Sequence, residues 1–527
     1  MGRKILFVTT DQQRYDSLGC NGGQIARTPV ADRLAAGGIT YRRAYNQNTV
    51  CMPARCTILT GQYARTHGVV ANGVPLPEDA PSVAAYLSEQ AGYKTALVGK
   101  AHFEPAFDMQ GRWEENSRWI RGDTGPWRGF DYSINAAHVA AFRGRPILHY
   151  GKWLAEHHPE HLESFAPLLG AEPGGDTGAP ETKHNPIARE WYHTDWTADR
   201  AIDWLDTVGD DDDWFLWLSF PDPHHPWDPP ASEMRRVDWR DLDLPPGHPG
   251  SPDAIREVLA QKPAHWLKWW EGTFSNAEGG PMTFCPGTLT DDQIREINAR
   301  AHVMNELIDE ATGRVLDRIA ARGWGDDTDV IFTTDHGELQ GDFGLVYKGP
   351  FHTDALMHLP LIWRPAPSAG VAPAEVTDPV GQLDLAPTFC AIAGVEPAEW
   401  MQGSALPSTD GEGGHERVLC EWDSQFPGYG MHSRSIYRDG WLCTAYEPST
   451  DGEPNGLEKH WGENVLTKCG VHYEGIEGEL YDVNEDPHQW RNLWDDAEYR
   501  SVRDDLVADL YDSLPSEFNH LEVEAPA

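Results

Sequence analysis

Four short apolar runs in this chain each end in a cluster of polar side chains, with helix-like segments between them. The runs are KILFVTT (residues 4–10), TALVG (95–99), WFLWLSF (214–220) and DVIFTT (329–334). Such runs are typical of strands buried on both faces, and helical spacing follows at 28–38, 81–93, 195–208 and 291–323. The alternation predicts an α/β fold, with a large mixed, mostly parallel sheet flanked by helices.

The polar clusters that follow these runs are Asp11-Gln12, Lys100-Ala101-His102, His224-His225 and Asp335-His336. In open α/β sheets, ligands bind outside the carboxyl ends of the strands. Because four clusters are expected at the same edge, that edge is the candidate site.

The pattern changes after about residue 405. The segments 418–424, 434–447 and 479–494 read as antiparallel strands, and a last helix is expected at about 498–513. We therefore predict a catalytic α/β domain at 1–405 and a smaller α+β domain at 406–527. Two Trp-, Pro- and Gly-rich insertions, about 109–193 and 230–287, lack a regular period. They are expected to form pocket walls or the contacts of a homo-oligomer, a dimer or tetramer.

Charge and cysteine usage limit the partners. Acidic residues outnumber basic ones 83 to 42, a formal net charge of -41, which argues against nucleic acid and anionic membrane surfaces. An anionic substrate would need a locally positive pocket. The 8 cysteines lack the spacing of a disulfide scaffold, and the chain shows neither a signal-peptide core nor a membrane-length run. We expect a cytoplasmic protein with reduced thiols.

Two groups of side chains at the sheet edge could carry chemistry. Hard oxygen donors and one imidazole suit Ca²⁺ or Mn²⁺, with Mg²⁺ and Zn²⁺ as alternatives. Taken singly, each of these residues could instead cap a helix or bond the backbone; as a set they favour a metal. The cationic group could form the positive pocket. The first group is Asp11, Gln12, Asp335 and His336, and the second is Arg55, Lys100, His102, His224 and Lys348.

The stretch NTVCMPARCTILTGQY (residues 48–63) contains a cysteine pair, Cys51 and Cys56. A zinc site would need a second ligand pair, and a redox pair would normally be C-x-x-C. C-x-P-x-R followed by Thr60-Gly61 resembles the maturation signature of the sulfatases, in the alkaline phosphatase superfamily. The resemblance extends to GKAHF at 99–103, PHHP at 223–226, TDHGE at 334–338, Lys348 and LYDVNEDPHQWRNL near the end.

The resemblance implies that a formylglycine-generating enzyme oxidises Cys51 to formylglycine, and that Cys56 is a packing residue. One divalent ion would be held by Asp11, Gln12, Asp335, His336 and the modified Cys51. The aldehyde hydrate would attack the sulfur or phosphorus of the substrate and form a covalent ester. The implied roles are fixing the hydrate (Arg55), neutralising the transferred group (Lys100, Lys348), protonating the leaving oxygen (His224 or Lys348) and expelling sulfate (His102).

Two departures from the common sulfatase pattern leave the substrate open. Gln12 stands where many sulfatases have a second aspartate, and Ala54 replaces serine, as in phosphonate monoester hydrolases and choline sulfatases. Lys100 and His102 favour sulfate, because the phosphonate enzymes carry hydroxyl residues there. The leading hypothesis is an arylsulfatase-like hydrolase, promiscuous toward phosphonate monoesters and phosphodiesters. The alternatives are one of those activities as the main one, a choline sulfatase, or a metal-containing binding protein with unmodified Cys51.

Overall fold

The computed structural model describes residues 2–108, 110–170, 172–274, 276, 280, 284–424, 430–449, 471–519, 521 and 524. Its centre is an eight-stranded sheet in the order β13-β2-β12-β11-β1-β10-β4-β5. The bounds are β1 (Lys4–Thr10), β2 (Ile39–Tyr41), β4 (Lys94–Gly99), β5 (Tyr132–Asn135), β10 (Trp214–Ser219), β11 (Thr328–Thr334), β12 (Leu361–Arg364) and β13 (Ala374–Val376).

The middle of this sheet is parallel. Strands β11, β1, β10, β4 and β5 pair in parallel, while β12 runs antiparallel to both β11 and β2. All seven residues of β1 and all seven of β11 are buried, which is why the centre of each strand is a continuous apolar run and not an alternating pattern. The predicted mixed, mostly parallel α/β sheet is confirmed.

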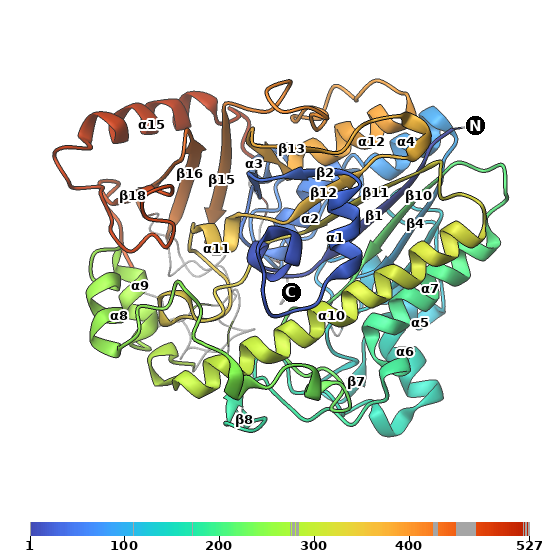
Figure 1. The fold of residues 1–527 in the computed structure, drawn as a ribbon, viewed down its shortest axis with the longest axis horizontal. Coiled ribbons are helices and arrows are strands. Elements are labelled where there is room, and N and C mark those ends of the chain that lie inside the picture. Colours follow the sequence, from blue (N-terminus) through green and yellow to red (C-terminus); the bar gives the residue numbers. More distant parts are fainter. Residues whose placement is uncertain are drawn as a thin grey trace.

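Helices cover both faces of the sheet (Figure 1). One face packs on α1 (Pro29–Ala36), α7 (His193–Thr207) and the long α10 (Asp291–Ala321), in a cluster that includes Leu6, Leu216 and Ile308. The other face packs on α2 (Cys51–Thr60), α4 (Val83–Ala91) and α12 (Leu385–Ala393), through residues such as Phe7, Ile58 and Phe389. Burial of apolar area on both faces is the main stabilising term.

The segment 109–193 holds more regular structure than the sequence suggested. It supplies the edge strand β5, and the helices α5 (Glu114–Arg121) and α6 (Leu148–His157). These elements are short and flanked by Trp and Gly, so their period is hard to read. The second insertion adds α8 (Pro252–Leu259) and α9 (Ala264–Trp270). Short elements link these parts: α3 (Ala64–His67), α11 (Asp354–Met357), β3 (Ala44–Tyr45), β14 (Val380–Gly381), β6 (Ala141–Phe142), β7 (Arg145–Pro146), β8 (Pro173–Gly174) and β9 (Ala179–Pro180).

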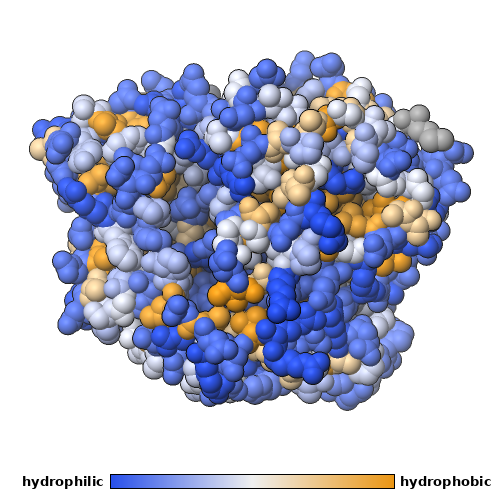
Figure 2. All heavy atoms as spheres, in the orientation of Figure 1, coloured by the Kyte–Doolittle hydropathy of each residue, from blue (hydrophilic) through white to orange (hydrophobic). Residues whose placement is uncertain are grey.

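The C-terminal part forms a four-stranded antiparallel sheet, β15-β16-β17-β18, as predicted. Its strands are β15 (Arg417–Asp423), β16 (His432–Arg438), β17 (Trp441–Glu447) and β18 (Gly478–Asp482), and α15 (Arg500–Ser513) packs on them. The face shown in Figure 2 is mostly hydrophilic. Within the described ranges, every helix is too short or too polar to cross a bilayer.

Candidate active site

Cys51 is the first residue of α2, whose ten residues are all buried. The helix ends at Gly61, which takes the left-handed conformation (φ 68°) that glycine adopts without strain. At the other end, Asn72 Oδ1 accepts a hydrogen bond of 3.0 Å from the Met52 N–H, one of the donors that a helix leaves unpaired. The sulfur of Cys51 is thereby held at the helix N-terminus, where partial positive charge favours an anion.

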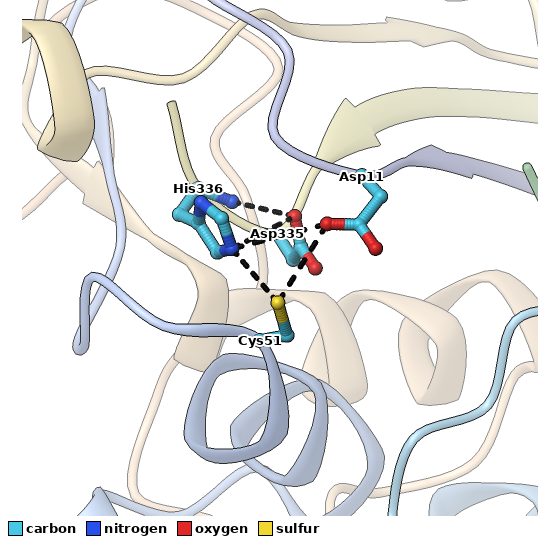
Figure 3. Close-up of side chains that lie close together, drawn as sticks. All are labelled: Asp11, Cys51, Asp335 and His336. Atoms are coloured by element: carbon cyan, nitrogen blue, oxygen red, sulfur yellow. Dashed lines mark hydrogen bonds and ion pairs between the residues drawn. The ribbon is translucent and has the colours of Figure 1, made fainter. Parts of the chain in front are cut away.

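The sulfur points toward side chains from the ends of β1 and β11 (Figure 3). His336 Nε2 lies 3.1 Å from Cys51 Sγ, and Asp11 Oδ1 lies 3.7 Å from it. His336 Nε2 also lies 3.8 Å from Asp335 Oδ1 and 3.9 Å from Asp11 Oδ1. One ligand atom from each of the four residues lies within 4.8 Å of the others, and all four residues are buried. Parallel strands β1 and β11 are neighbours, so residues 11 and 335 meet.

Cations surround this cluster although the chain as a whole is acidic. Arg55 Nε donates to Asp335 Oδ2 at 2.8 Å, and its Nη1 donates to the Lys100 carbonyl at 3.0 Å. Lys100 Nζ forms an ion pair with Asp11. Burial raises the pKa of Asp11, but Lys100 and Arg55 outweigh burial and leave that pKa well below its ordinary value. Asp11 is therefore ionised and able to bind a cation.

Lys348 connects two of the predicted site residues. Its Nζ lies 2.6 Å from Gln12 Oε1 and 2.7 Å from His224 Nε2, while His224 Nδ1 faces the His225 carbonyl. This arrangement fits a neutral His224 whose Nδ1–H donates and whose Nε2 accepts from Lys348. Burial, followed by neighbouring His138, lowers the pKa of His224 well below its ordinary value, which agrees with a neutral ring.

His102 lies in the loop after β4. It is 5% exposed, and neither ring nitrogen has a hydrogen-bond partner among the residues that the structure describes. Burial, followed by Lys100 and Arg55, lowers its pKa well below the ordinary value, so the imidazole is neutral and can accept a proton.

The ten predicted site residues are all buried at this edge of the sheet, although their roles stay predictions. Gln12 was predicted to be a metal ligand, but its side chain is hydrogen-bonded to Lys348 and Glu338. Only its backbone N–H contacts the cluster, by donating to Asp335 Oδ1 at 3.0 Å. Cys56 lies inside α2, where burial raises the pKa of its thiol. His225, the neighbour of His224, has its Nδ1 2.8 Å from Glu181 Oε2.

One further residue at the site, His138, was not predicted from the sequence. Its ring stacks on His224 with centroids 4.0 Å apart, and one of its nitrogens lies within 4.8 Å of ligand atoms of Asp11 and His224. His138 follows β5 as Asp11 follows β1 and Asp335 follows β11. The strand before it, YSIN, could have indicated this position. It was missed because its four residues lie in the insertion that was predicted to lack regular structure.

The donor set fits a hard or borderline divalent cation. Two buried carboxylates and one imidazole converge, and each has a second partner. Arg55 holds Asp335, and Lys100 pairs with Asp11. His336 Nδ1 contacts the Gly337 carbonyl at 2.9 Å, which leaves Nε2 facing the cluster. Such a second contact sets the orientation of a ligating imidazole. Asp11, Asp335 and His336, with the residue at position 51, are thus the ligand candidates.

Comparison with known proteins identifies the family. Residues 3–395 match the family model described as "Sulfatase". The sulfatase YidJ of Escherichia coli is 27% identical over 98% of this chain and 88% of its own length. The multifunctional alkaline phosphatase superfamily protein PehA of Trinickia caryophylli is also 27% identical, over 95% of this chain and 93% of its own. A phosphonate monoester hydrolase of Agrobacterium radiobacter superposes with a TM-score of 0.74 at 24% identity, covering 97% and 95% of the two chains. The family model spans most of the chain, which therefore belongs to the sulfatase family, within the alkaline phosphatase superfamily.

Proposed function

We propose that this protein hydrolyses sulfate monoesters with a formylglycine made from Cys51 and one divalent metal ion. One observation carries the proposal: a buried cysteine at a helix N-terminus faces metal-ligand candidates and is ringed by Arg55, Lys100 and Lys348. A cationic ring in a chain of net charge -41 fits an anionic substrate. The same pocket would accept phosphonate monoesters and phosphodiesters as side activities.

A divalent ion, Ca²⁺ or Mn²⁺ by preference, would be held by Asp11, Asp335, His336, oxidised Cys51 and, after a change of partner, Gln12. When bound, the ion and the aldehyde hydrate supply a nucleophile of lowered pKa. Arg55 then acts as a positioning residue, because its guanidinium contacts Asp335, the Lys100 carbonyl and, at 2.9 Å, Ser219 Oγ.

Lys348 is the proposed proton donor to the leaving oxygen. Its ammonium already donates to His224 Nε2, so His224 orients the lysine and has no ring proton on that side to give. With Cys51 as a thiol, burial lowers the pKa of Lys348, but Cys51 and Asp11 outweigh burial, so the pKa lies above its ordinary value and the amine is protonated. Lys100 neutralises the transferred group, and neutral His102 accepts the proton that restores the aldehyde.

A second candidate activity is phosphonate monoester or phosphodiester hydrolysis as the main reaction. The observation in its favour is Gln12, a neutral amide that binds Lys348 and leaves the ligand set one charge less negative. Maturation would require a formylglycine-generating enzyme under either activity. The expected cytoplasmic location, homo-oligomer and domain boundary near residue 405 stay predictions.

The experiment compares kcat/KM for 4-nitrophenyl sulfate and 4-nitrophenyl phenylphosphonate in one preparation with quantified Cys51 oxidation. Because the leaving group is the same, the ratio measures stabilisation of the transferred centre. We expect sulfate to be preferred, and expect Cys51→Ala and prior chelation of the metal each to abolish turnover. Cys56→Ala is the matched control on the same helix, and should remain active.

Two results would contradict the proposal. Wild-type turnover in Cys51→Ala would show that residue 51 does not supply the nucleophile. Unmodified Cys51 in active enzyme from the native host would favour another mechanism. A preference for the phosphonate would leave the machinery intact and select the second candidate.

A further inference from the structure

The loop that carries His102 has an unusual backbone. His102 has φ 58°, in the left-handed region that residues other than glycine rarely adopt. Such a conformation persists only where the surroundings determine it. The Lys100 end of the loop is held by the sheet, since the Lys100 N–H donates to the Ser219 carbonyl at 2.8 Å. The His102 end needs a different partner.

That partner is Glu115, from the first turn of α5. Its carboxylate accepts hydrogen bonds from three successive N–H groups: His102 at 2.7 Å, Phe103 at 2.9 Å and Glu104 at 3.1 Å. Three converging N–H groups form an anion-binding concavity, which here binds a side chain of the same protein. Glu115 is only 1% exposed, so water does not compete for these bonds.

The contact is reciprocal. Glu115 N–H donates to Glu104 Oε2 at 2.7 Å, and Arg128 pairs with Glu104 and donates to the Leu76 carbonyl at 2.7 Å. Burial, followed by Glu104, raises the pKa of Glu115 to about 7, so the buried carboxylate is held at an energetic cost. We propose that Glu115 is a positioning residue that fixes the imidazole of His102 for its proton transfer. The proposal deepens the proposed function and rests on it.

The first test does not depend on turnover. In protein with unmodified Cys51, amide hydrogen exchange is measured for Glu115→Gln and for Glu114→Gln. Glu114 precedes Glu115 on α5, but is exposed and pairs with Arg121 at 2.6 Å on the surface. We expect the amides of residues 102–104 to exchange about 10-fold faster in Glu115→Gln and unchanged in Glu114→Gln. Unchanged exchange in both variants would contradict the proposal that Glu115 holds this loop.

The second test uses matured enzyme and 4-nitrophenyl sulfate. Misplacing His102 should slow the release step and spare the release of nitrophenol. Glu115→Gln should therefore give a burst of one nitrophenol per oxidised Cys51, then a steady rate lower by about 10-fold or more. Sulfate retained on the acid-quenched peptide that contains Cys51 is the direct readout. Equal loss of burst and steady rate would mean a general structural role and would overturn the proposal.

A double-mutant cycle separates positioning from fold support. If Glu115 acts through His102, Glu115→Gln in a His102→Ala background should slow release no further. Additive losses would overturn the proposal. If Glu115→Gln does not fold, Glu115→Asp, which retains the charge at shorter reach, replaces it in both tests. A wild-type enzyme without turnover would contradict the proposed function alone, because the exchange experiment still tests whether Glu115 holds the backbone of residues 102–104.

Discussion

At the residue scale, one lysine organises the proposed proton transfer. Lys348 lies between Gln12 and His224, two residues that the sequence placed at the site without indicating their contact. The sequence left open whether His224 or Lys348 protonates the leaving group. The contacts around Lys348 favour it as the proposed donor, because a neutral His224 with its proton on Nδ1 would accept, and not donate, at the nitrogen that faces the site.

Replacing Lys348 should therefore cost most with poor leaving groups. We expect Lys348→Met to lower kcat/KM by about 100-fold for 4-nitrophenyl sulfate and by more for phenyl sulfate, whose leaving oxygen needs a proton more. His224→Asn should cost less and show little dependence on the leaving group. The measurement is kcat/KM across phenyl sulfates of graded leaving-group pKa. A steeper dependence for the His224 variant than for the Lys348 variant would reverse the assignment.

His138 permits a test of ring stacking against hydrogen bonding. Its Nδ1 has no partner among the described residues, although the side chain is 4% exposed. His138→Phe retains the ring against His224 and removes both nitrogens. If a nitrogen bonds the substrate, the Phe variant should lose about 10-fold in kcat/KM, as for a hydrogen bond to a charged group. Near-wild-type kinetics for His138→Phe with a defective His138→Ala would instead assign His138 to packing.

At the element scale, strand ends were predictable and side-chain contacts were not. Asp11, Lys100, His224 and Asp335 follow apolar runs that the sequence shows plainly, so the sheet edge and most of the site could be inferred. The edge strand β5 has only four residues, too few to show a hydrophobic periodicity. Because the strand was not predicted, His138, which follows it, was not predicted as a site residue. The Glu115 contact was unreadable because it depends on a left-handed residue that no local pattern specifies.

A buried amine, that of Lys262, is one of the contacts between the second insertion and the C-terminal sheet. Lys262 Nζ lies 3.5 Å from Glu479 Oε2 on β18 and donates to the Gln489 carbonyl at 2.9 Å. Burial lowers the pKa of Lys262 to about 8, from 10.5 for a free side chain, against the opposing charge of Glu479. Between these values the unfolded chain holds a proton that the folded chain has released, so this group's contribution to stability rises with pH.

Urea unfolding at several pH values checks this contribution. The free energy of unfolding of the wild type, relative to Lys262→Met, should rise on the order of 2 kcal/mol between about pH 8 and about pH 10. Lys268→Met, on the same insertion, serves as the control because Lys268 is only partly buried, whereas Lys262 is buried. Parallel pH curves for wild type and Lys262→Met would show that the amine titrates normally.

At the scale of the whole molecule, 83 acidic side chains oppose compaction and the approach of an anionic substrate. Salt screens repulsion between exposed charges beyond about 10 Å at 0.1 M. The melting temperature should therefore rise by several degrees when NaCl is raised from about 0.01 to about 0.3 M. Trimethylamine N-oxide, which stabilises without screening, is the comparison, and a melting temperature that falls with NaCl would contradict the argument.

The burial of Cys51 also bears on when the proposed oxidation can occur relative to synthesis and folding of the chain. In the folded protein its side chain is 1% exposed, and Asp335 and His336, which close over it, are synthesised more than 280 residues later. If Cys51 is oxidised as proposed, its burial predicts that the maturation enzyme must act before this stretch folds. Under the proposed function, oxidation and folding would then compete in time, and a chain that folds first would keep its thiol. A synthetic peptide of this stretch should be oxidised readily, and the folded thiol protein should not.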